Sequence, residues 1–220
     1  GKSASVCALG NLLGRTPKVF SLEEESAGNH TLFFDWLEYT GGFFKGYSIS
    51  CQIVSVPGQL SLAARHHLWQ TADVVVFVLD ASNDNMEIPL NYFKNLQQPV
   101  AKLGENTVQA IIQANKQDKP HAATTAQLKE IFQEYPQIKI VESVALSGKG
   151  IRETFVLAVR LAVERAAALM AKGQMHYGKP EINSGEEFVS VLQRANFSLR
   201  EETETLTELP EISEGLKTTD

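Results

Sequence analysis

Two runs of apolar, largely β-branched residues constrain the fold of this chain more than any other feature. They are "VVVFVLD" at residues 74–80 and "VQAIIQA" at residues 108–114. The first is a continuous apolar run, which is typical of a central parallel strand buried on both faces of a sheet, and the second reads as another buried strand. "IKIVESVAL" at residues 138–146 adds another strand, and helical patterns separate the three. Repeated strand-then-helix units predict an open, mostly parallel α/β sheet with helices on both faces, and ligands bind outside the carboxyl ends of such strands.

Two further runs predict an antiparallel hairpin at one edge of the sheet. Residues 31–39, "TLFFDWLEY", read as one strand, and residues 47–56, "YSISCQIVSV", alternate with the period of two that strands have. We expect Gly41 and Gly42 at the tip of the turn between them. The polar stretch "SLEEESAGNH" at residues 21–30 predicts a loop.

The remaining patterns define the domain organisation. Helices are expected at residues 3–13, 86–103, 124–132 and 150–173, and in the stretch "PGQLSLAARHHLWQ" after an initial loop. We therefore place one domain at residues 1–173 and a C-terminal extension at residues 174–220. The extension begins as a linker and could form a short amphipathic helix at residues 185–197, which could dock on a partner. It ends in an acidic, Thr-rich stretch whose composition predicts disorder.

The charge of the chain lies in its C-terminal stretch. Residues 201–220 carry seven acidic side chains and one lysine, so the net charge of −6 falls there and residues 1–200 are neutral. A neutral body argues against nucleic acid as a partner, because phosphate binding requires clustered Lys and Arg. Cys7 and Cys51 have no metal or disulfide spacing, which favours a reducing cytosol. No apolar run approaches the roughly 20 residues of a membrane helix. We expect a cytoplasmic protein, with a polar or membrane-peripheral position left open.

The loop after the second apolar run, "NKQD", carries the first candidate site residues. A carboxylate at Asp118 can accept two hydrogen bonds from one planar partner. The edge of guanine offers two N–H donors in that arrangement, whereas adenine offers none. The stem of Lys116 can lie over the base, while Asn115 ties neighbouring loops together. Taken alone, the motif could also be an ordinary polar turn.

A second marked loop, "SVPGQ", follows the last strand of the hairpin. Gly58 lacks a Cβ, so its backbone N–H can approach a γ-phosphate closely. Gln59 lies where a side chain can orient an attacking water. The alternative is a Pro-Gly turn that simply ends a strand.

Two weaker signals complete the set of loops. Ala145 in "VALSGKG" could present its backbone N–H to the guanine O6. Gly1-Lys2-Ser3 reads as the end of a phosphate-binding loop. Lys2 would then reach the β- and γ-phosphates, and the Ser3 hydroxyl would ligate Mg²⁺.

The spacing of these loops supports one site. Ser55 and Asn115 lie 60 residues apart, and Asn115 and Ala145 lie 30 apart. Each interval admits one further strand with a helix, so all four loops fall at the same end of the sheet. Together they predict a site for GTP or GDP with Mg²⁺.

The longest of these motifs resembles a known family. "HTLFFDWLEYTGGFFKGYSISCQIVSVPGQ", followed by "VVVFVLDAS" and "NKQD", is similar to the bacterial gliding-motility MglA-type small Ras-like GTPases. The likeness covers about residues 1–172 and is strongest over residues 31–59. It implies a P-loop GTPase fold and a polarity switch that is active with GTP. It also implies a dimeric, MglB-related GTPase-activating partner of the roadblock fold.

The resemblance assigns roles to single residues. Thr31 matches the switch threonine that senses Mg²⁺ and γ-phosphate, and Gln59 matches the catalytic glutamine. Ser55 stands where most Ras-like proteins carry Asp; this family commonly has Thr there, so Mg²⁺ would be held through water at that corner. The residue before the switch threonine is usually an Arg, proposed as an internal arginine finger, but here it is His30. A neutral imidazole cannot give the bidentate cationic clamp of Arg, so we expect slow hydrolysis of GTP.

Three functions stay open at this point. The first is a GTP-hydrolysing switch that controls bacterial polarity or motility, and Gln59 favours it. The second is a GTP-binding scaffold with little or no hydrolysis that recruits polarity proteins, and His30 favours it. The third, an ATP-dependent kinase, is the weakest, because the motif from Asn115 to Asp118 selects guanine.

The Ras-like strand order predicts that a strand is missing. In that order the strand before the phosphate loop lies between the strands at residues 47–56 and 74–80. We therefore expect about 20 residues upstream of Gly1 that supply this strand and the start of a P-loop, with Gly1 as the last glycine of the motif.

Several other residues have ordinary explanations. Adjacent His66 and His67 point to different faces of a helix, so they suit a partner surface better than a metal site. We expect Trp69 to pack inward and Asp35 to face solvent. The aromatic residues of the hairpin are expected to be part core and part partner surface: Phe33, Phe34, Trp36, Phe43 and Phe44.

Overall fold

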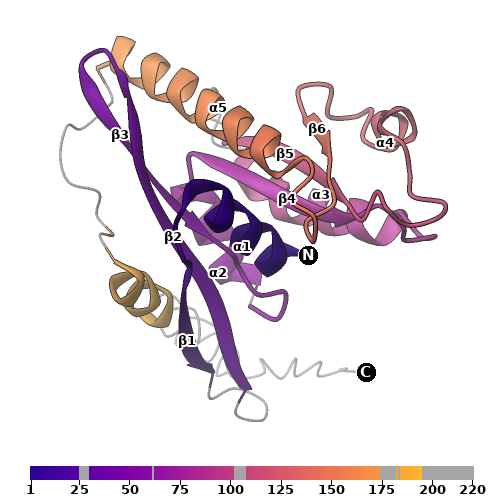
Figure 1. Ribbon diagram of the computed structural model, residues 1–220, viewed down its shortest axis with the longest axis horizontal. Helices are drawn as coiled ribbons and strands as arrows, with labels where there is room; N and C mark the ends of the chain where they lie inside the picture. Colours follow the sequence, from indigo (N-terminus) through magenta and orange to yellow (C-terminus); the bar gives the residue numbers. More distant parts are fainter. Residues whose placement is uncertain (25–29, 61, 102–107, 174–181, 183, 195–220) are drawn as a thin grey trace, which may run out of the picture.

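The computed structural model describes residues 1–24, 30–60, 62–101, 108–173, 182 and 184–194, and Figure 1 shows the course of the chain. Its described strands form two three-stranded sheets, one antiparallel and one parallel. Helices pack against both sheets, so the predicted α/β class is confirmed. The acidic tail and almost all of the predicted linker lie outside the described residues.

The parallel sheet is formed by the apolar runs of the sequence. β4 (Val74–Asp80), β5 (Gln109–Asn115) and β6 (Lys139–Glu142) lie in that order, with β5 in the middle. β5 is buried from Ala110 to its end, as the sequence predicts, whereas most of β4 is half-buried. The expectation that β4 is buried on both faces is therefore wrong, because among the described strands β5 is its one paired neighbour.

The antiparallel sheet contains the predicted hairpin and a strand that the sequence analysis missed. β2 (His30–Phe44) pairs with β3 (Tyr47–Val54), which confirms the hairpin. β1 (Lys18–Glu24) pairs with the first half of β2, so the loop expected at residues 21–30 is wrong over its first part. Leu22 of β1 is only 1% exposed, and the burial of this side chain gives an otherwise polar segment a reason to form a strand.

The turn of the hairpin lies further along the chain than predicted. Lys45 and Gly46 form its tip, with φ angles of 48° and 86°. Gly41 and Gly42 lie instead where the register between β2 and β3 shifts, and Gly42 has a φ of 79°. Glycines inside a strand commonly mark such irregularities, because they adopt backbone angles that other residues avoid.

The two sheets are not joined to each other. β3 and β4 are not hydrogen-bonded neighbours in the described part of the chain. The break lies where the sequence analysis expects a strand that this chain lacks. The strand expected to be absent from this chain would lie between β3 and β4, and its existence stays a prediction.

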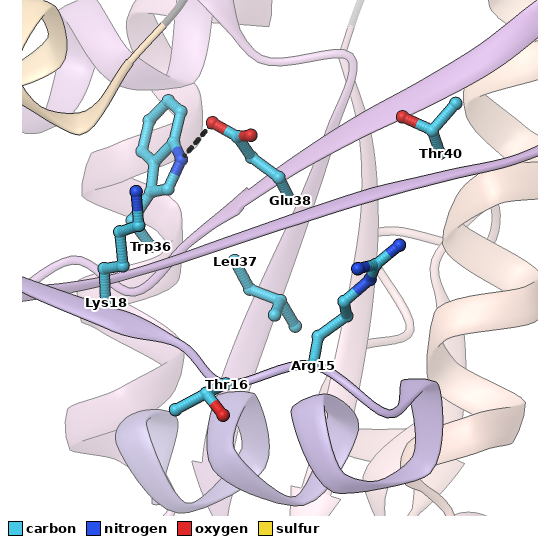
Figure 2. Close-up of a pocket in the computed structure, with 7 residues that line it drawn as sticks. All are labelled: Arg15, Thr16, Lys18, Trp36, Leu37, Glu38 and Thr40. Atoms are coloured by element: carbon cyan, nitrogen blue, oxygen red, sulfur yellow. Dashed lines mark hydrogen bonds between the residues drawn. The ribbon is translucent and has the colours of Figure 1, made fainter.

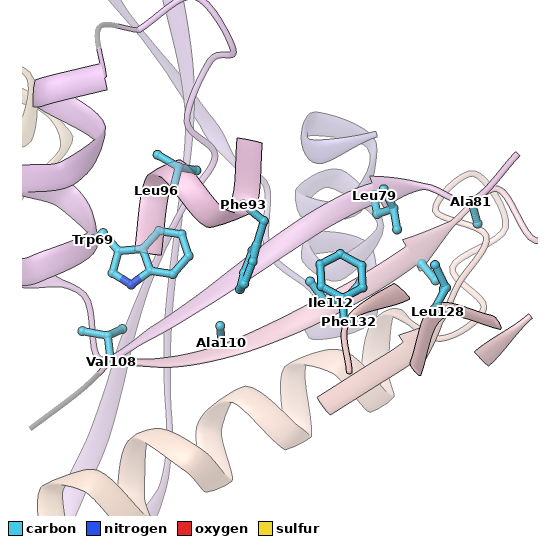
Figure 3. Close-up of a cluster of buried hydrophobic side chains, with 11 residues drawn as sticks. Trp69, Leu79, Ala81, Phe93, Leu96, Val108, Ala110, Ile112, Leu128 and Phe132 are labelled. Atoms are coloured by element: carbon cyan, nitrogen blue, oxygen red, sulfur yellow. The ribbon is translucent and has the colours of Figure 1, made fainter. Parts of the chain in front are cut away.

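One face of the parallel sheet is covered by α2 (Leu62–Thr71), α3 (Glu87–Ala101) and α4 (Thr125–Ile131). Figure 3 shows Trp69 and Phe93 gathered over β4 and β5. Phe93 is fully buried and Trp69 is 4% exposed, so the prediction that Trp69 packs inward is confirmed. α4 begins with a capping box in which the side chains of Thr124 and Gln127 each bond the other's backbone N–H. These contacts build the main core of the domain.

The opposite side carries α1 (Lys2–Leu13) and α5 (Ile151–Ala171). Ile111 and Ile112 of β5 are both fully buried although neighbouring strand residues point to opposite faces. Ile112 belongs to the core under α3, and Ile111 therefore faces the side where α5 contacts β5. A separate apolar cluster joins α1 to α5 and to β2 through Leu37. Helices on both faces of the parallel sheet are thereby confirmed.

A further helical segment spans residues 185–194 and is drawn in yellow beside β1 in Figure 1. It confirms the helix expected at residues 185–197 over its described part. This segment packs on the antiparallel sheet of its own chain. None of the described helices is long and apolar enough to cross a membrane.

Candidate functional site

The centre of the candidate site is Asn115, the last residue of β5. Its side chain is 4% exposed, and its Oδ1 accepts the backbone N–H of Ala145 at 2.8 Å and the hydroxyl of Ser143 at 3.4 Å. These bonds tie the loop after β5 to the loop after β6. The N–H that the sequence analysis assigned to guanine O6 is donated to Asn115 in this structure, so the role of Ala145 in base binding stays a prediction.

Lys116 is held in an unusual conformation beside Asn115. Its φ is 67°, a left-handed angle that costs a residue with a side chain about 1–2 kcal/mol. The Lys116 Nζ donates to Asp80 Oδ2 at 2.5 Å, and Asp80 Oδ1 also accepts the backbone N–H and the hydroxyl of Ser82, at 3.1 and 2.7 Å. Burial raises the pKa of Asp80, but the hydrogen bonds from Lys116 and Ser82 outweigh it and leave this pKa below its ordinary value.

Asp80 is a site residue that the sequence analysis missed. It ends β4 directly opposite Asn115 in the ladder with β5. The available signal was its position, since it ends the apolar run at the sheet end where the other marked loops lie. Asp118 completes this side of the site. Its carboxylate is exposed, and none of the residues that the structure describes donates a hydrogen bond to it, so both of its oxygens can accept from a ligand.

The start of α1 reaches the same place. A Cβ added to Gly1 would lie 2.9 Å from Asn115 Nδ2 and 3.2 Å from Val78, so this position requires glycine. The structure thus brings the predicted phosphate-binding residues beside the predicted base-binding loop, at the carboxyl ends of β4 and β5.

The predicted switch residues meet in a different hollow. A space of about 500 Å³ is lined by Thr31, Leu32, Phe33, Pro57 and Gln59. Thr31 and Gln59 are both exposed, and open space surrounds Gly58, where an added Cβ would meet nothing within 4 Å. Two segments, residues 31–33 and residues 57–59, are therefore brought together as a switch would require.

Ser55 and Asp35 form a buried pair that corrects the sequence analysis. Asp35 is 8% exposed rather than facing solvent, and Ser55 is 7% exposed. The Ser55 hydroxyl donates to Asp35 Oδ2 at 2.5 Å and accepts the backbone N–H of Asp35 at 3.0 Å. A buried carboxylate requires such a partner, which explains why the strand position tolerates Asp. The hydroxyl predicted to face a magnesium-bound water is used within the protein.

The residues expected to hold Mg²⁺ are Ser3 and Thr31, both exposed. No hydrogen bond joins them in the described part of the chain, and there no group of three or more His, Cys, Asp or Glu side chains could hold a metal ion. Hydroxyl oxygens suit Mg²⁺, which is bound by few protein ligands together with waters and phosphate oxygens. Each hydroxyl is therefore of a kind that Mg²⁺ accepts, and that the two bind one ion stays a prediction.

A second hollow, of about 310 Å³, is shown in Figure 2. It lies between the end of α1 and β2, and its lining includes Arg15, Lys18 and Glu38, with Trp36 Nε1 donating to Glu38 at 2.8 Å. None of the predicted site residues lines it. The side chains of His30, His66 and His67 lie outside the described residues.

Comparison with known proteins agrees with this geometry. The ADP-ribosylation factor family matches residues 45–160, more than half of the chain. The mutual gliding-motility protein MglA of Myxococcus xanthus (strain DK1622) is 31% identical over 147 residues, which is 66% of this chain and 74% of that protein. This chain belongs to the MglA-type small Ras-like GTPases. The family match contains Gln59, the loop from Asn115 to Asp118 and Ala145, and it ends before the helical segment at residues 185–194.

For an MglA-type GTPase, the loops described above have an expected chemistry. Members of this class bind GTP or GDP with Mg²⁺, hydrolyse GTP and act as switches. Which residues of this chain hold the base, the phosphates and Mg²⁺ stays a prediction.

Proposed function

We propose that this GTPase is a nucleotide-dependent switch in bacterial cell polarity or motility, with hydrolysis that is slow without an activating partner. The observation that carries the proposal is the joined loop pair at Asn115 and Ala145, with Lys116 fixed beside it and the carboxylate of Asp118 exposed. The likeness to a protein named for gliding motility supports the process.

Each site residue then has one task in binding. Asp118 accepts the two N–H donors of guanine, and Lys116 lies along the base. Lys2 binds the β- and γ-phosphates from the first turn of α1, where the helix dipole also favours negative charge. Ser3 and Thr31 ligate Mg²⁺, which neutralises the charge that develops on the phosphates.

Hydrolysis depends on the turn at Gly58 and Gln59. Gly58 gives its backbone N–H to the γ-phosphate, and Gln59 orients the water that attacks it. The exposed position of both residues leaves the catalytic turn without fixed partners in the described structure, which is consistent with slow hydrolysis by the chain alone. A roadblock-fold, MglB-like dimer that presses on this turn would raise the rate.

A second function is favoured by one residue. His30 stands where the family usually has arginine, and a neutral imidazole lacks the charge that stabilises the transition state. In that case the chain is a GTP-binding scaffold with little hydrolysis that recruits polarity proteins.

The test uses the protein expressed from its natural start codon. Phosphate release from GTP is measured in a single turnover, alone and with a cognate roadblock-fold protein, and Gln59→Ala is the control. A switch shows slow release that the partner accelerates and that Gln59→Ala abolishes. Tight GTP binding with no release under either condition supports the scaffold, and tighter binding of ATP than of GTP contradicts both.

A further inference from the structure

The helical segment at residues 185–194 covers an apolar surface of its own chain. We call this surface the β1–β2 face. Its members come from β1, from β2, from the turn before α2 and from α2 itself, and they are 0–4% exposed: Leu22, Leu32, Phe34, Trp36, Leu60 and Ala64. Phe188 and Leu192 of the segment complete the cluster, at 6% and 0% exposure. The two covering residues are four apart, so they lie on one side of a helix. The segment therefore binds as an amphipathic helix on a sheet.

Ring contacts define the centre of this docking. The Phe188 ring centroid lies 5.7 Å from that of Phe34, with an interplanar angle of 77°. It also lies 5.7 Å from the ring of Trp36. The contact with Phe34 is edge-to-face, and such contacts are favourable beyond the area that they bury. Phe188 is thus inserted between two side chains of β2.

The entry to the helix is specific as well. Ser184 caps it, with its Oγ accepting the backbone N–H of Glu187 at 3.2 Å. A Cβ on Gly185 would lie 2.1 Å from the ring of Phe20, so glycine is required for this close approach. Gln52 of β3 donates to the carbonyl of Ile182 at 2.8 Å. Polar and steric contacts, in addition to apolar ones, therefore define the position of the segment on the β1–β2 face.

The residues that hold the helix are close in sequence to both segments that line the hollow at Gln59, which are residues 31–33 and residues 57–59. Leu32 and Phe34 of β2 belong to the cluster under the helix, and Leu32 also lines the hollow that contains Thr31 and Gln59. Leu60 follows Gln59 directly and is fully buried in the same cluster. A movement of β2 or of this turn on nucleotide exchange therefore moves residues that hold the helix. Packed interfaces of this kind change between discrete arrangements rather than by continuous deformation.

We propose that the β1–β2 face is a helix-binding surface that the chain occupies with its own residues 184–194, and that exchange of GDP for GTP changes this occupancy. The coupling rests on the proposed function. A partner that competes for this face must present an amphipathic helix with two large apolar side chains four residues apart. Because linkage is reciprocal, displacing the segment also changes the relative affinities for GDP and GTP.

Trp36 provides a direct measure of docking. The chain has two tryptophans, and Trp69→Phe leaves Trp36 as the sole one. That change is mild, because the buried Trp69 Nε1 has no hydrogen-bond partner in the described structure. Acrylamide quenching of Trp36 fluorescence in the Trp69→Phe protein should be weak. Adding Phe188→Ala should raise the quenching constant several-fold.

Two more variants separate docking from a general loss of structure. Gly185→Val should release the segment through its clash with Phe20 and raise quenching in the same way, without truncating a core side chain. Phe155→Ala is the matched control, because it removes another ring that contacts β2, at 5.7 Å from Tyr39, but on α5. Trp36 should stay protected in that variant. Unchanged quenching in both Phe188→Ala and Gly185→Val overturns the docking.

The effect of the nucleotide is tested with the Trp69→Phe protein, and the amount of bound nucleotide is measured directly. Quenching with GDP and with a non-hydrolysable GTP analogue should differ several-fold, and Phe188→Ala should remove the difference. Equal quenching with both nucleotides bound overturns the coupling while the proposed function stands. Failure to bind any guanine nucleotide overturns the proposed function and the coupling together, and the Phe188→Ala comparison alone then decides the docking.

Discussion

Replacing Asp80 by asparagine perturbs the site at a single charge. The change removes the ion pair between Asp80 and Lys116, whose atoms lie 2.5 Å apart, and keeps the shape of the side chain. Lys116 has a left-handed φ of 67°, which residues with a side chain rarely adopt, so its position depends on contacts such as this ion pair. Without Asp80 its side chain samples many orientations, and fewer of them lie along a bound base.

The expected effects on nucleotide affinity and on the free energy of unfolding differ in size. The two side chains are 46% and 39% exposed, so the pair contributes only about 0–1 kcal/mol to the free energy of unfolding. Nucleotide binding must then order the long side chain of Lys116, which costs about 0.5–1.5 kcal/mol, or roughly two- to tenfold in affinity. We expect Asp80→Asn to weaken GDP binding by this factor while the unfolding midpoint changes little.

The assay is the dissociation rate of a fluorescent GDP analogue, with urea denaturation measured in parallel. Asp73→Asn is the matched control, because Asp73 pairs with Arg165 at 2.7 Å just before the other end of β4. That variant should lose a similar amount of stability and release GDP at the original rate. The reasoning is refuted if Asp80→Asn releases GDP at the unmodified rate, or if Asp73→Asn accelerates release equally.

The ion pair between Asp80 and Lys116 also predicts that the free energy of unfolding depends on pH. Burial raises the pKa of Asp80, but hydrogen bonds from Lys116 and Ser82 outweigh it, so the folded-state pKa lies below the ordinary value. A lowered carboxyl pKa contributes stability that is complete above the unfolded value of about 3.9 and is lost as pH falls through the folded value. The difference in unfolding free energy between the natural protein and Asp80→Asn should therefore be constant near neutral pH and shrink in acid. A difference that grows in acid would contradict this assignment.

Three further substitutions test other parts of the account. Asp118→Asn should shift binding from guanine towards xanthine nucleotides in a competition assay, because the amide offers one donor and one acceptor; an unchanged preference would contradict the assigned role. Ser55→Ala should lower the free energy of unfolding by about 1–3 kcal/mol in urea, because Asp35 stays buried with fewer partners, whereas Ser55→Thr should retain the bond; equal losses would argue against it. His30→Arg should raise single-turnover hydrolysis of GTP with the partner present, and an unchanged rate would exclude the arginine-finger argument.

The loops of the site could be predicted because their signals are local. The "NKQD" and "SVPGQ" motifs each follow a recognisable strand, and the sheet places the ends of its parallel strands together. The two apolar runs predicted β4 and β5 because an apolar run is also a local signal in the sequence. The order and spacing of the loop motifs then predicted that the site lies at the carboxyl ends of the parallel strands.

The features that the sequence analysis missed depend on contacts across long separations. Asp80 became a site residue through Lys116, 36 positions away, and Asp35 became buried through Ser55, 20 positions away. β1 forms because Leu22 meets a core built by β2 and the distant Phe188. A period of two or of 3.6 residues indicates which side of an element is apolar, but it does not indicate which distant element covers it.

The central claim is that the joined loops at Asn115 and Asp118 form a guanine site. Equilibrium titration of GDP and of ADP into the protein expressed from its natural start codon, in the presence of Mg²⁺, tests it most directly. The account predicts saturable binding of GDP, a large preference over ADP, and loss of that preference in Asp118→Asn. Equal affinity for the two nucleotides, or tighter binding of ADP, would contradict it.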